Sequence, residues 1–468
     1  MHAQTNQATR NRISSSCLIY LLLCLFLLVQ PVSAQWIENE IVSTANAKTN
    51  RERGLTILED IKQVIKKQYY DETFHGIDID ERFKVAAERI KKLDANWQIF
   101  RVIAQVLLDF NDSHTRFFPP PRAMRLEYGF SMQMIGNDCY VVAVKKGSDA
   151  EAKGIKAGDI VLKISGYTPT KDNLSTILYL IYQLHPQQKL PLALRSDDGT
   201  ERETIVEAKF RTSEEVAKEK AKRKSDKKET PFKCKEVSTE TIACKLYTFS
   251  VEKNQIDKMM KEARKYKKLI LDLRGNGGGY IRTEKYLTGY FFDRDVKVGD
   301  QVRRKKVEEQ IARSLKEKVF SGELIVLIDS NSASASEVFA RVIQIEKRGK
   351  VVGDVSAGAV MASYFIPITE GHGDWDSATW WYFGINVTMA DLIMSDGKRL
   401  ENVGVIPDRP VGPTASALFQ RDDPTLAYAA SLFGTKLTQE QAREFHFITY
   451  RDEDEDGKDD DVSGDEAK

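Results

Sequence analysis

Residues 324–337 read Leu-Ile-Val-Leu-Ile-Asp-Ser-Asn-Ser-Ala-Ser-Ala-Ser-Glu and contain the clearest fold signal in the chain. The five apolar residues predict a buried strand, and the small residues after them predict a turn into a helix that begins near Ser334. Such a turn can expose a nucleophile beside helix N-terminal N–H groups, which can stabilise a developing oxyanion. Ser334 and Glu337 also have the spacing of a capping box, in which Ser334 would only cap the helix. This segment alone leaves both interpretations open.

The segments around this stretch alternate between strands and helices. We expect strands near residues 241–249, 269–273 and 324–328, and helices near residues 254–265 and from about Ser334. Alternation of this kind is typical of βαβ units around a mostly parallel sheet. The sequence therefore predicts an α/β fold class for this half of the chain.

A glycine cluster follows the predicted strand at 269–273. Residues 271–279 read Leu-Asp-Leu-Arg-Gly-Asn-Gly-Gly-Gly. No Gly-Lys-Ser/Thr follows, so the cluster is not a P-loop, and the Gly-x-Gly-x-x-Gly spacing of a dinucleotide site is absent. Because glycine lets the backbone approach a ligand closely, two interpretations remain: a tight turn, or a backbone N–H donor for an oxyanion.

Two shorter motifs lie far from the serine-rich stretch. Asp112-Ser113-His114-Thr115 forms a polar turn just before the prolines at 119–121. A single histidine in such a turn is more often structural or solvated, and a functional role would require Ser334 to lie nearby in space. Residues 401–408, Glu-Asn-Val-Gly-Val-Ile-Pro-Asp, are by themselves typical of an exposed turn before an edge strand.

The hydrophobic periodicity divides the rest of the chain. Residues 50–110 have helical periodicity, whereas residues 122–209 contain short alternating strands and one amphipathic helix at 174–184. The predicted domains are a signal peptide (1–34), an N-terminal helical subdomain (35–118), a β module (119–210), a charged linker (211–235), an α/β core (236–420) and a C-terminal segment with an acidic tail (421–468).

Composition excludes several classes of protein. The chain has 468 residues, of which 41% are hydrophobic and 30% charged, and this excludes full-length disorder. The net charge of +1 combines +2 at residues 1–34, −7 at residues 451–468 and +6 in the rest of the chain, which is not basic enough to suggest nucleic acid as the main partner. Residues 451–468 are strongly acidic and partly follow a calcium-loop spacing, but Ser463 stands where a bidentate Glu is expected. We therefore expect a solvated tail.

The N-terminus has the layout of a secretory signal. Arg10 and Arg12 precede an apolar run at residues 17–29, and Val32-Ser33-Ala34 provides small residues for cleavage. The run is shorter than the ~20 residues of a membrane span, so we expect cleavage after Ala34 and no stable membrane insertion. The resulting protein would be periplasmic or extracellular. An uncleaved N-terminal anchor is the alternative.

Three cysteines remain after this cleavage. Cys139, Cys234 and Cys244 do not have zinc-ligand spacing, and three cysteines cannot form a disulfide framework. Cys234 and Cys244 could pair in an oxidising compartment, or both could be buried free thiols. Neither a metal nor an organic cofactor is expected.

Taken together and in this order, the four motifs resemble the tail-specific (C-terminal processing) serine peptidases and their tricorn-like relatives. The resemblance extends from about Thr56 to Val411 and implies a catalytic core with the crotonase-like (ClpP/crotonase) superfold. Residues 119–210 resemble a PDZ domain. In such a module Tyr128, Gly129 and Phe130 would bind the C-terminus of a peptide by strand addition.

The resemblance also implies the catalytic residues. The Ser/Lys branch of the family has its base in a Gly-Lys-Gly segment downstream of the nucleophile, but the equivalent residue here is Ala359. The tricorn-like branch uses Ser-His-Ser-Glu, with the first Ser and the His adjacent, and this chain has such a pair. The implied roles are nucleophile (Ser334), general base (His114), bridging serine (Ser113), carboxylate (Glu401, with Asp391 and Asp396 as alternatives) and oxyanion donors (Gly278 and Ala335).

These roles imply an exported serine endopeptidase that cleaves polypeptides by acyl-enzyme chemistry. One alternative is a catalytically silent relative that binds peptides or hydrophobic ligands, because a fold does not guarantee an activity. The other is a Ser/Lys enzyme that uses some other lysine. Activity that survives a His114→Ala substitution would favour this second alternative.

Overall fold

The structure is a computed structural model that describes residues 44–122, 124–212, 214–218, 231–372, 379–443 and 445. The expected signal peptide (1–34), the acidic tail (451–468) and most of the charged linker (211–235) lie outside these residues. Among the residues described, no helix is long and apolar enough to cross a membrane.

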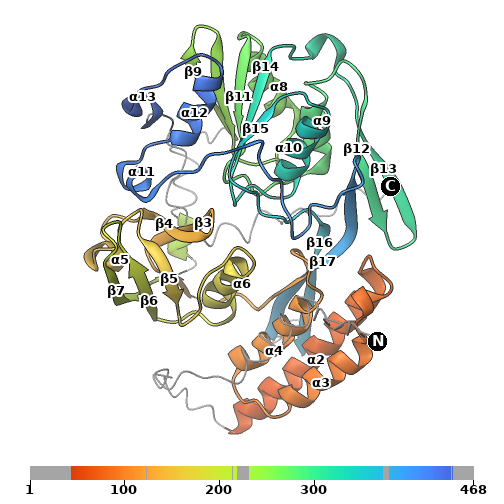
Figure 1. Ribbon diagram of the computed structural model, residues 1–468. Helices are drawn as coiled ribbons and strands as arrows, with labels where there is room; N and C mark the ends of the chain where they lie inside the picture. The colour runs from red at the N-terminus through yellow and green to blue at the C-terminus, as the bar shows by residue number, and fades with distance from the viewer. Residues whose placement is uncertain are drawn as a thin grey trace, which may run out of the picture. The chain divides into compact units, whose positions relative to one another are not determined.

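A six-stranded sheet forms the centre of the C-terminal half (Figure 1). Its strand order is β18-β15-β14-β11-β10-β9, and every neighbouring pair is parallel except β10 and β9. The mostly parallel α/β core predicted from the sequence is therefore confirmed. The strands are β9 (Phe232–Ser238), β10 (Thr241–Leu246), β11 (Lys268–Asp272), β14 (Glu323–Ile328), β15 (Lys350–Gly353) and β18 (Arg409–Pro410).

Helices cover both faces of this sheet. Successive residues of a strand point to opposite faces, so Leu271 packs against α8, α9 and α10, whereas Ile270 packs against α12. Each fully buried Leu or Ile contributes roughly 1.5–3 kcal/mol, which is why the central strands are apolar on both faces. The helices of this half are α8 (Lys253–Ala263), α9 (Ile281–Thr288), α10 (Ala335–Ile345), α11 (Ala415–Gln420), α12 (Pro424–Leu432) and α13 (Gln439–Arg443).

The predicted β module is a five-stranded antiparallel sheet with the order β3-β4-β5-β6-β7. Strands β2 and β8, which precede and follow these five strands in the sequence, pair with each other in a separate two-stranded sheet. Its elements are β2 (Met124–Glu127), β3 (Phe130–Ile135), β4 (Asp138–Val144), α5 (Asp149–Ala152), β5 (Ile160–Ile164), α6 (Leu174–Tyr179), η2 (Leu180–Leu184), β6 (Lys189–Arg195), β7 (Glu201–Glu207) and β8 (Lys209–Thr212).

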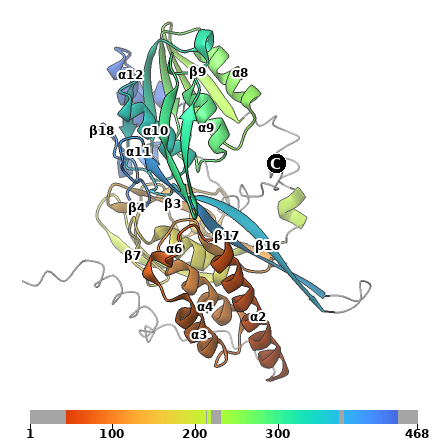
Figure 2. The same ribbon diagram turned by 90° about the vertical axis from the view of Figure 1, so that its right-hand side faces the viewer.

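Three N-terminal helices pack on a sheet that the sequence analysis did not predict. This antiparallel sheet has the order β1-β17-β12-β13, and β16 pairs with β17 to form the long hairpin seen in Figure 2. The helices do not form a core alone, because Phe383, Ile385 and Val387 of β17 complete it. The elements are α2 (Thr44–Gln68), η1 (Phe74–Gly76), α3 (Ile79–Ile90), α4 (Asn96–Leu108), β1 (Arg116–Phe118), β12 (Val296–Arg303), β13 (Lys306–Ala312), η3 (Lys316–Lys318), β16 (Ala362–His372) and β17 (Thr379–Met394).

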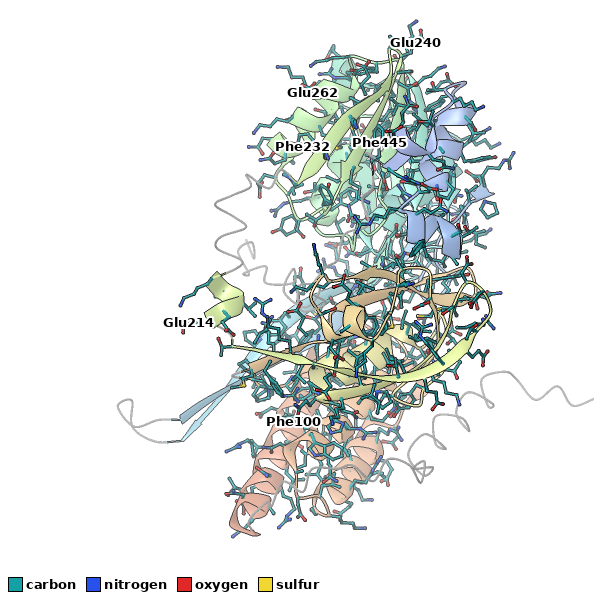
Figure 3. The ribbon with its side chains drawn as sticks, turned by 90° about the vertical axis from the view of Figure 1, so that its left-hand side faces the viewer. Phe100, Glu214, Phe232, Glu240, Glu262 and Phe445 are labelled. Carbon is teal, nitrogen blue, oxygen red and sulfur yellow. A yellow bond between two sulfur atoms is a disulfide. The ribbon has the colours of Figure 1, made fainter. Side chains whose placement is uncertain are left out.

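Figure 3 labels aromatic side chains in two hydrophobic regions. Phe100 lies among the N-terminal helices, and Phe232 and Phe445 lie at the six-stranded sheet. Cys234 and Cys244, which are directly opposite each other on β9 and β10, form a disulfide. The structure thereby decides between the two alternatives that the sequence left open. Cys139 is a buried free thiol.

Candidate active site

Ser334 occupies the turn between β14 and α10, as the sequence predicts. Its backbone has φ 53° and ψ −118°, a left-handed conformation that is strained for a residue with a side chain. The Ser334 side chain makes no cap hydrogen bond to the helix. The interpretation of Ser334 as only a side-chain cap therefore does not fit the structure, and its hydroxyl is not committed to the helix backbone.

Glu337, one helical turn later, organises the backbone around Ser334. Its buried carboxylate accepts hydrogen bonds from the N–H groups of Ser334 (2.9 Å), Gly358 (2.7 Å) and Ala359 (2.9 Å), and from the hydroxyl of Ser356 (2.6 Å). Burial raises the pKa of Glu337, and these hydrogen bonds act in the opposite direction. Glu337 thus holds residues 356–359 against the serine.

Ala359 stands where the Ser/Lys branch has its base. Its carbonyl oxygen accepts a hydrogen bond from the Ser334 N–H at 2.8 Å, so this position is adjacent to the serine. An alanine side chain cannot take up a proton. A base at the serine must therefore come from another part of the chain.

His114 lies in a turn of residues 112–115, called here the histidine turn. Its Nδ1 is 2.6 Å from the Ser113 hydroxyl. The Ser113 N–H donates to Glu401 Oε1 at 2.7 Å, and Glu401 Oε2 accepts from the Val360 N–H at 2.8 Å. Glu401 therefore joins the histidine turn to the loop that Glu337 holds beside Ser334.

The order of these bonds differs in one respect from the expected relay. The resemblance implies that Ser113 bridges Glu401 and His114 through its side chain. In the structure the Ser113 hydroxyl bonds to the imidazole, and Glu401 binds the backbone N–H of the same residue. When Nδ1–H donates to the Ser113 hydroxyl, Nε2 carries the lone pair that a general base needs.

The two alternative carboxylates are committed elsewhere. Asp391 pairs with Arg399, and Asp396 pairs with Arg341. Neither forms a hydrogen bond with the histidine turn among the described residues. Of the three carboxylates considered from the sequence, Glu401 is the one that the structure brings to this turn.

The glycine-rich turn, residues 274–279, lies against Ser334. Gly278 has φ +103°, and a Cβ atom there would lie 2.7 Å from the Cβ of Ser334 and 3.1 Å from the nitrogen of Ala335. Only glycine permits this approach. Ala335 begins α10, where N–H groups have no acceptor within the helix. The Gly278 N–H, in contrast, donates to Asn276 Oδ1 at 2.9 Å, so in this structure it is already engaged.

Buried charges anchor the glycine-rich turn. Arg274 donates both terminal nitrogens to the carboxylate of Asp423, at 2.8 and 2.7 Å, and also binds Asp272. Although burial opposes it, the charges of Arg274 and Lys245 lower the pKa of Asp272. The Gly275 N–H donates to Asp329 Oδ1 at 2.8 Å, which ties this turn to the segment before Ser334.

The peptide-binding residues predicted for the β module lie at the start of β3, an edge strand. Tyr128 is buried, and its hydroxyl donates to the carbonyl of Gln187 at 2.7 Å, so its side chain supports the module from inside. Gly129 has φ +79°, and Phe130 is buried. Farther along β3, Gln133 donates to Asp329 Oδ2 at 2.8 Å and thereby connects the module to the turn before Ser334.

The sequence predicts no more than a helix-capping role for Glu337 and indicates no role for Asp112 or Asn276. The spacing of Glu337 from Ser334 is the available signal, because an acid on the otherwise apolar start of α10 needs buried partners. In the described ranges, no group of three or more His, Cys, Asp or Glu side chains is placed to hold a metal ion.

The α/β core places a serine at a helix N-terminus beside a glycine-rich turn, and Glu401 joins the loop next to that serine to a turn that carries a histidine. Together with the comparisons below, this arrangement identifies a serine-type peptidase, a hydrolase. Residues 243–411 match the model of peptidase family S41. The chain is therefore similar to family S41 over these residues, and over most of its length it is similar to C-terminal processing peptidases.

Two relatives align with most of the chain. The chloroplastic C-terminal processing peptidase of Tetradesmus obliquus is 22% identical over 378 residues, which cover 75% of this chain and 76% of the relative. The carboxyl-terminal-processing protease of Picosynechococcus sp. is 23% identical over 397 residues, 81% of this chain and 88% of the relative. The crystal structure of mature CPAF matches the fold with a TM-score of 0.60 and 13% identity, over 86% of this chain and 99% of that one.

Proposed function

We propose that this protein is an exported serine endopeptidase of the tricorn-like branch, which cleaves polypeptides through an acyl-enzyme. One observation carries the proposal. Glu401 binds the histidine turn with one carboxylate oxygen and the Val360 N–H with the other, and the loop at Val360 is held against Ser334 by Glu337. This arrangement provides a base, a carboxylate and a serine hydroxyl that does not cap its helix.

In the proposed mechanism the Ser334 hydroxyl attacks the scissile carbonyl while His114 Nε2 accepts its proton. The imidazole then donates that proton to the leaving amine, and water hydrolyses the acyl-enzyme by the same base. The N–H of Ala335 would bind the oxyanion. Gly278 would join it when its N–H leaves Asn276, and one such donor typically accounts for ~10²–10³ in turnover.

We further propose that the core has the crotonase-like superfold and that residues 119–210 act as a PDZ-like module. The edge of β3 remote from β4 would add a substrate strand, with the substrate's C-terminus at residues 128–130. The disulfide between Cys234 and Cys244 supports a periplasmic or extracellular location, because disulfides persist in oxidising compartments. No metal or organic cofactor takes part in this scheme.

The alternative is a catalytically inactive relative that binds peptides or hydrophobic ligands. The strained backbone of Ser334 argues against it, because such strain persists where the surrounding structure maintains it for a purpose. A binding protein would gain nothing from a left-handed serine with an uncommitted hydroxyl.

The test is proteolysis of an unfolded, C-terminally labelled protein by the full mature chain. Ser334→Ala and His114→Ala should both be inactive, whereas Ser416→Ala, on an exposed position of α11, should cut like the wild type. Cleavage by His114→Ala would reject the base assignment and favour a Ser/Lys enzyme. A wild type without activity on several unfolded substrates would favour the binding protein.

A further inference from the structure

The carboxylate of Asp112 collects hydrogen bonds from three separate parts of the chain. Its Oδ1 accepts from the N–H groups of His114 (3.0 Å) and Thr115 (2.6 Å) and from the hydroxyl of Thr388 (2.8 Å). Its Oδ2 accepts from the hydroxyls of Tyr69 (2.9 Å) and Thr115 (2.8 Å). Asp112 is only 8% exposed, and it forms no ion pair with a cation among the described residues.

The donors show what this carboxylate holds together. Tyr69 follows the last turn of α2, and Thr388 belongs to β17. The Thr388 N–H donates back to the Thr115 hydroxyl at 3.2 Å, and the Tyr70 N–H donates to the Thr388 carbonyl at 3.1 Å. The histidine turn is therefore attached to a helix and a strand that are remote from it in sequence.

The backbone N–H groups of the histidine turn donate to two carboxylates, those of Glu401 and Asp112. The N–H of Ser113 donates to Glu401, and the next two N–H groups, of His114 and Thr115, donate to Asp112. Three successive N–H groups thus point at fixed acceptors. Hydrogen bonds to charged acceptors are shorter and stronger than neutral ones, so this segment has little freedom to rotate.

We propose that Asp112 is a positioning residue that sets the location and direction of the His114 imidazole through its backbone. The inference rests on the proposed role of His114 as the base. Asp112 binds the His114 N–H and not the ring, so its effect is geometric. Displacing a reacting group by about 1 Å can cost roughly 10²-fold in rate, which sets the scale of the expected effect.

Three variants of the full chain test this role. Asp112→Ala removes all five acceptor contacts, and we expect kcat per folded enzyme to fall about 10²-fold while KM changes less than about threefold. Asp112→Asn keeps one oxygen for the two backbone N–H groups, and the hydroxyls can turn to accept from its amide. We expect it to recover at least about tenfold of the loss. Tyr69→Phe is the matched control, because it removes one hydrogen bond to the same carboxylate, together with a bond to His75 Nε2, and leaves the two N–H contacts intact.

A second measurement does not depend on activity. Hydrogen exchange of a peptide that spans residues 112–116 should be at least about tenfold faster in Asp112→Ala than in Tyr69→Phe, because exchange reports local opening. If Asp112→Ala lowers kcat no more than Tyr69→Phe does, or if Asp112→Asn restores nothing, Asp112 does not position the base. If His114→Ala remains active while exchange still accelerates in Asp112→Ala, the base assignment fails but the control of the turn by Asp112 stands.

Discussion

Replacing Glu337 with Gln should damage both stability and catalysis. Each carboxylate oxygen accepts two hydrogen bonds: Oε1 from Ser356 and Gly358, and Oε2 from Ser334 and Ala359. Each oxygen therefore faces at least one backbone N–H. A glutamine must direct its NH2 group at one of these pairs, and a backbone N–H cannot reverse to accept.

The magnitude follows from the bonds lost. At least one charge-assisted bond becomes a contact between two donors, and hydrogen bonds to charged groups contribute roughly 1.5–3 kcal/mol each. Removing the buried charge returns some free energy, because burial disfavours the ionised form. We expect the free energy of unfolding to fall by about 2–4 kcal/mol. Because Ser334 loses its anchor, kcat should also fall by about 10²-fold.

The assay is urea unfolding at pH 8 together with kcat on a labelled peptide. Glu284→Gln is the matched control, because Glu284 is equally buried on α9 but has a single hydrogen bond, from Thr288, and an unpaired Oε2. That variant should be as stable as the wild type or more so. If the free energy of unfolding of Glu337→Gln instead lies within about 0.5 kcal/mol of the wild-type value and kcat is unchanged, the carboxylate does not organise the backbone around Ser334.

Three further predictions concern other parts of the core. Burial raises the pKa of Glu284 to about 8, so the folded protein keeps a proton that the unfolded chain loses above about pH 4.5. Stability should therefore fall by about 1.4 kcal/mol per pH unit as the pH rises between these values, and Glu284→Gln should abolish this dependence in urea titrations at pH 5 and 8. Arg274→Lys should cost about 3–5 kcal/mol, because a lysine cannot satisfy the buried carboxylate of Asp423 with two parallel bonds; an unchanged unfolding midpoint would contradict this. Replacing both Cys234 and Cys244 with Ser should lower the free energy of unfolding by about 2–3 kcal/mol. A reductant should lower the free energy of unfolding of the wild type by the same amount and leave that of the variant unchanged.

Patterns of residues that are close in the sequence were sufficient to predict several secondary-structure elements and motifs of this protein. The apolar run at 324–328 and the small residues after it predicted β14, the turn and the start of α10. The adjacency of Ser113 and His114 and the glycine cluster at 274–279 were visible as motifs. These features depend on residues that are close in sequence, where periodicity, glycine and capping preferences act directly.

Contacts between distant segments were decided only by the tertiary structure. Glu401 meets the N–H of Ser113, and Thr388 meets Asp112, across 288 and 276 residues. No local periodicity encodes such a meeting, because it depends on how β17 and the 401–408 segment pack after the chain has folded. Packing between distant segments also decides that Glu401, and not Asp391 or Asp396, bonds to the histidine turn. It likewise gives Glu337 its hydrogen bonds to residues 356–359 in addition to its bond at the start of the helix. The sequence by itself determined which groups could react, and packing determined which of them stand together.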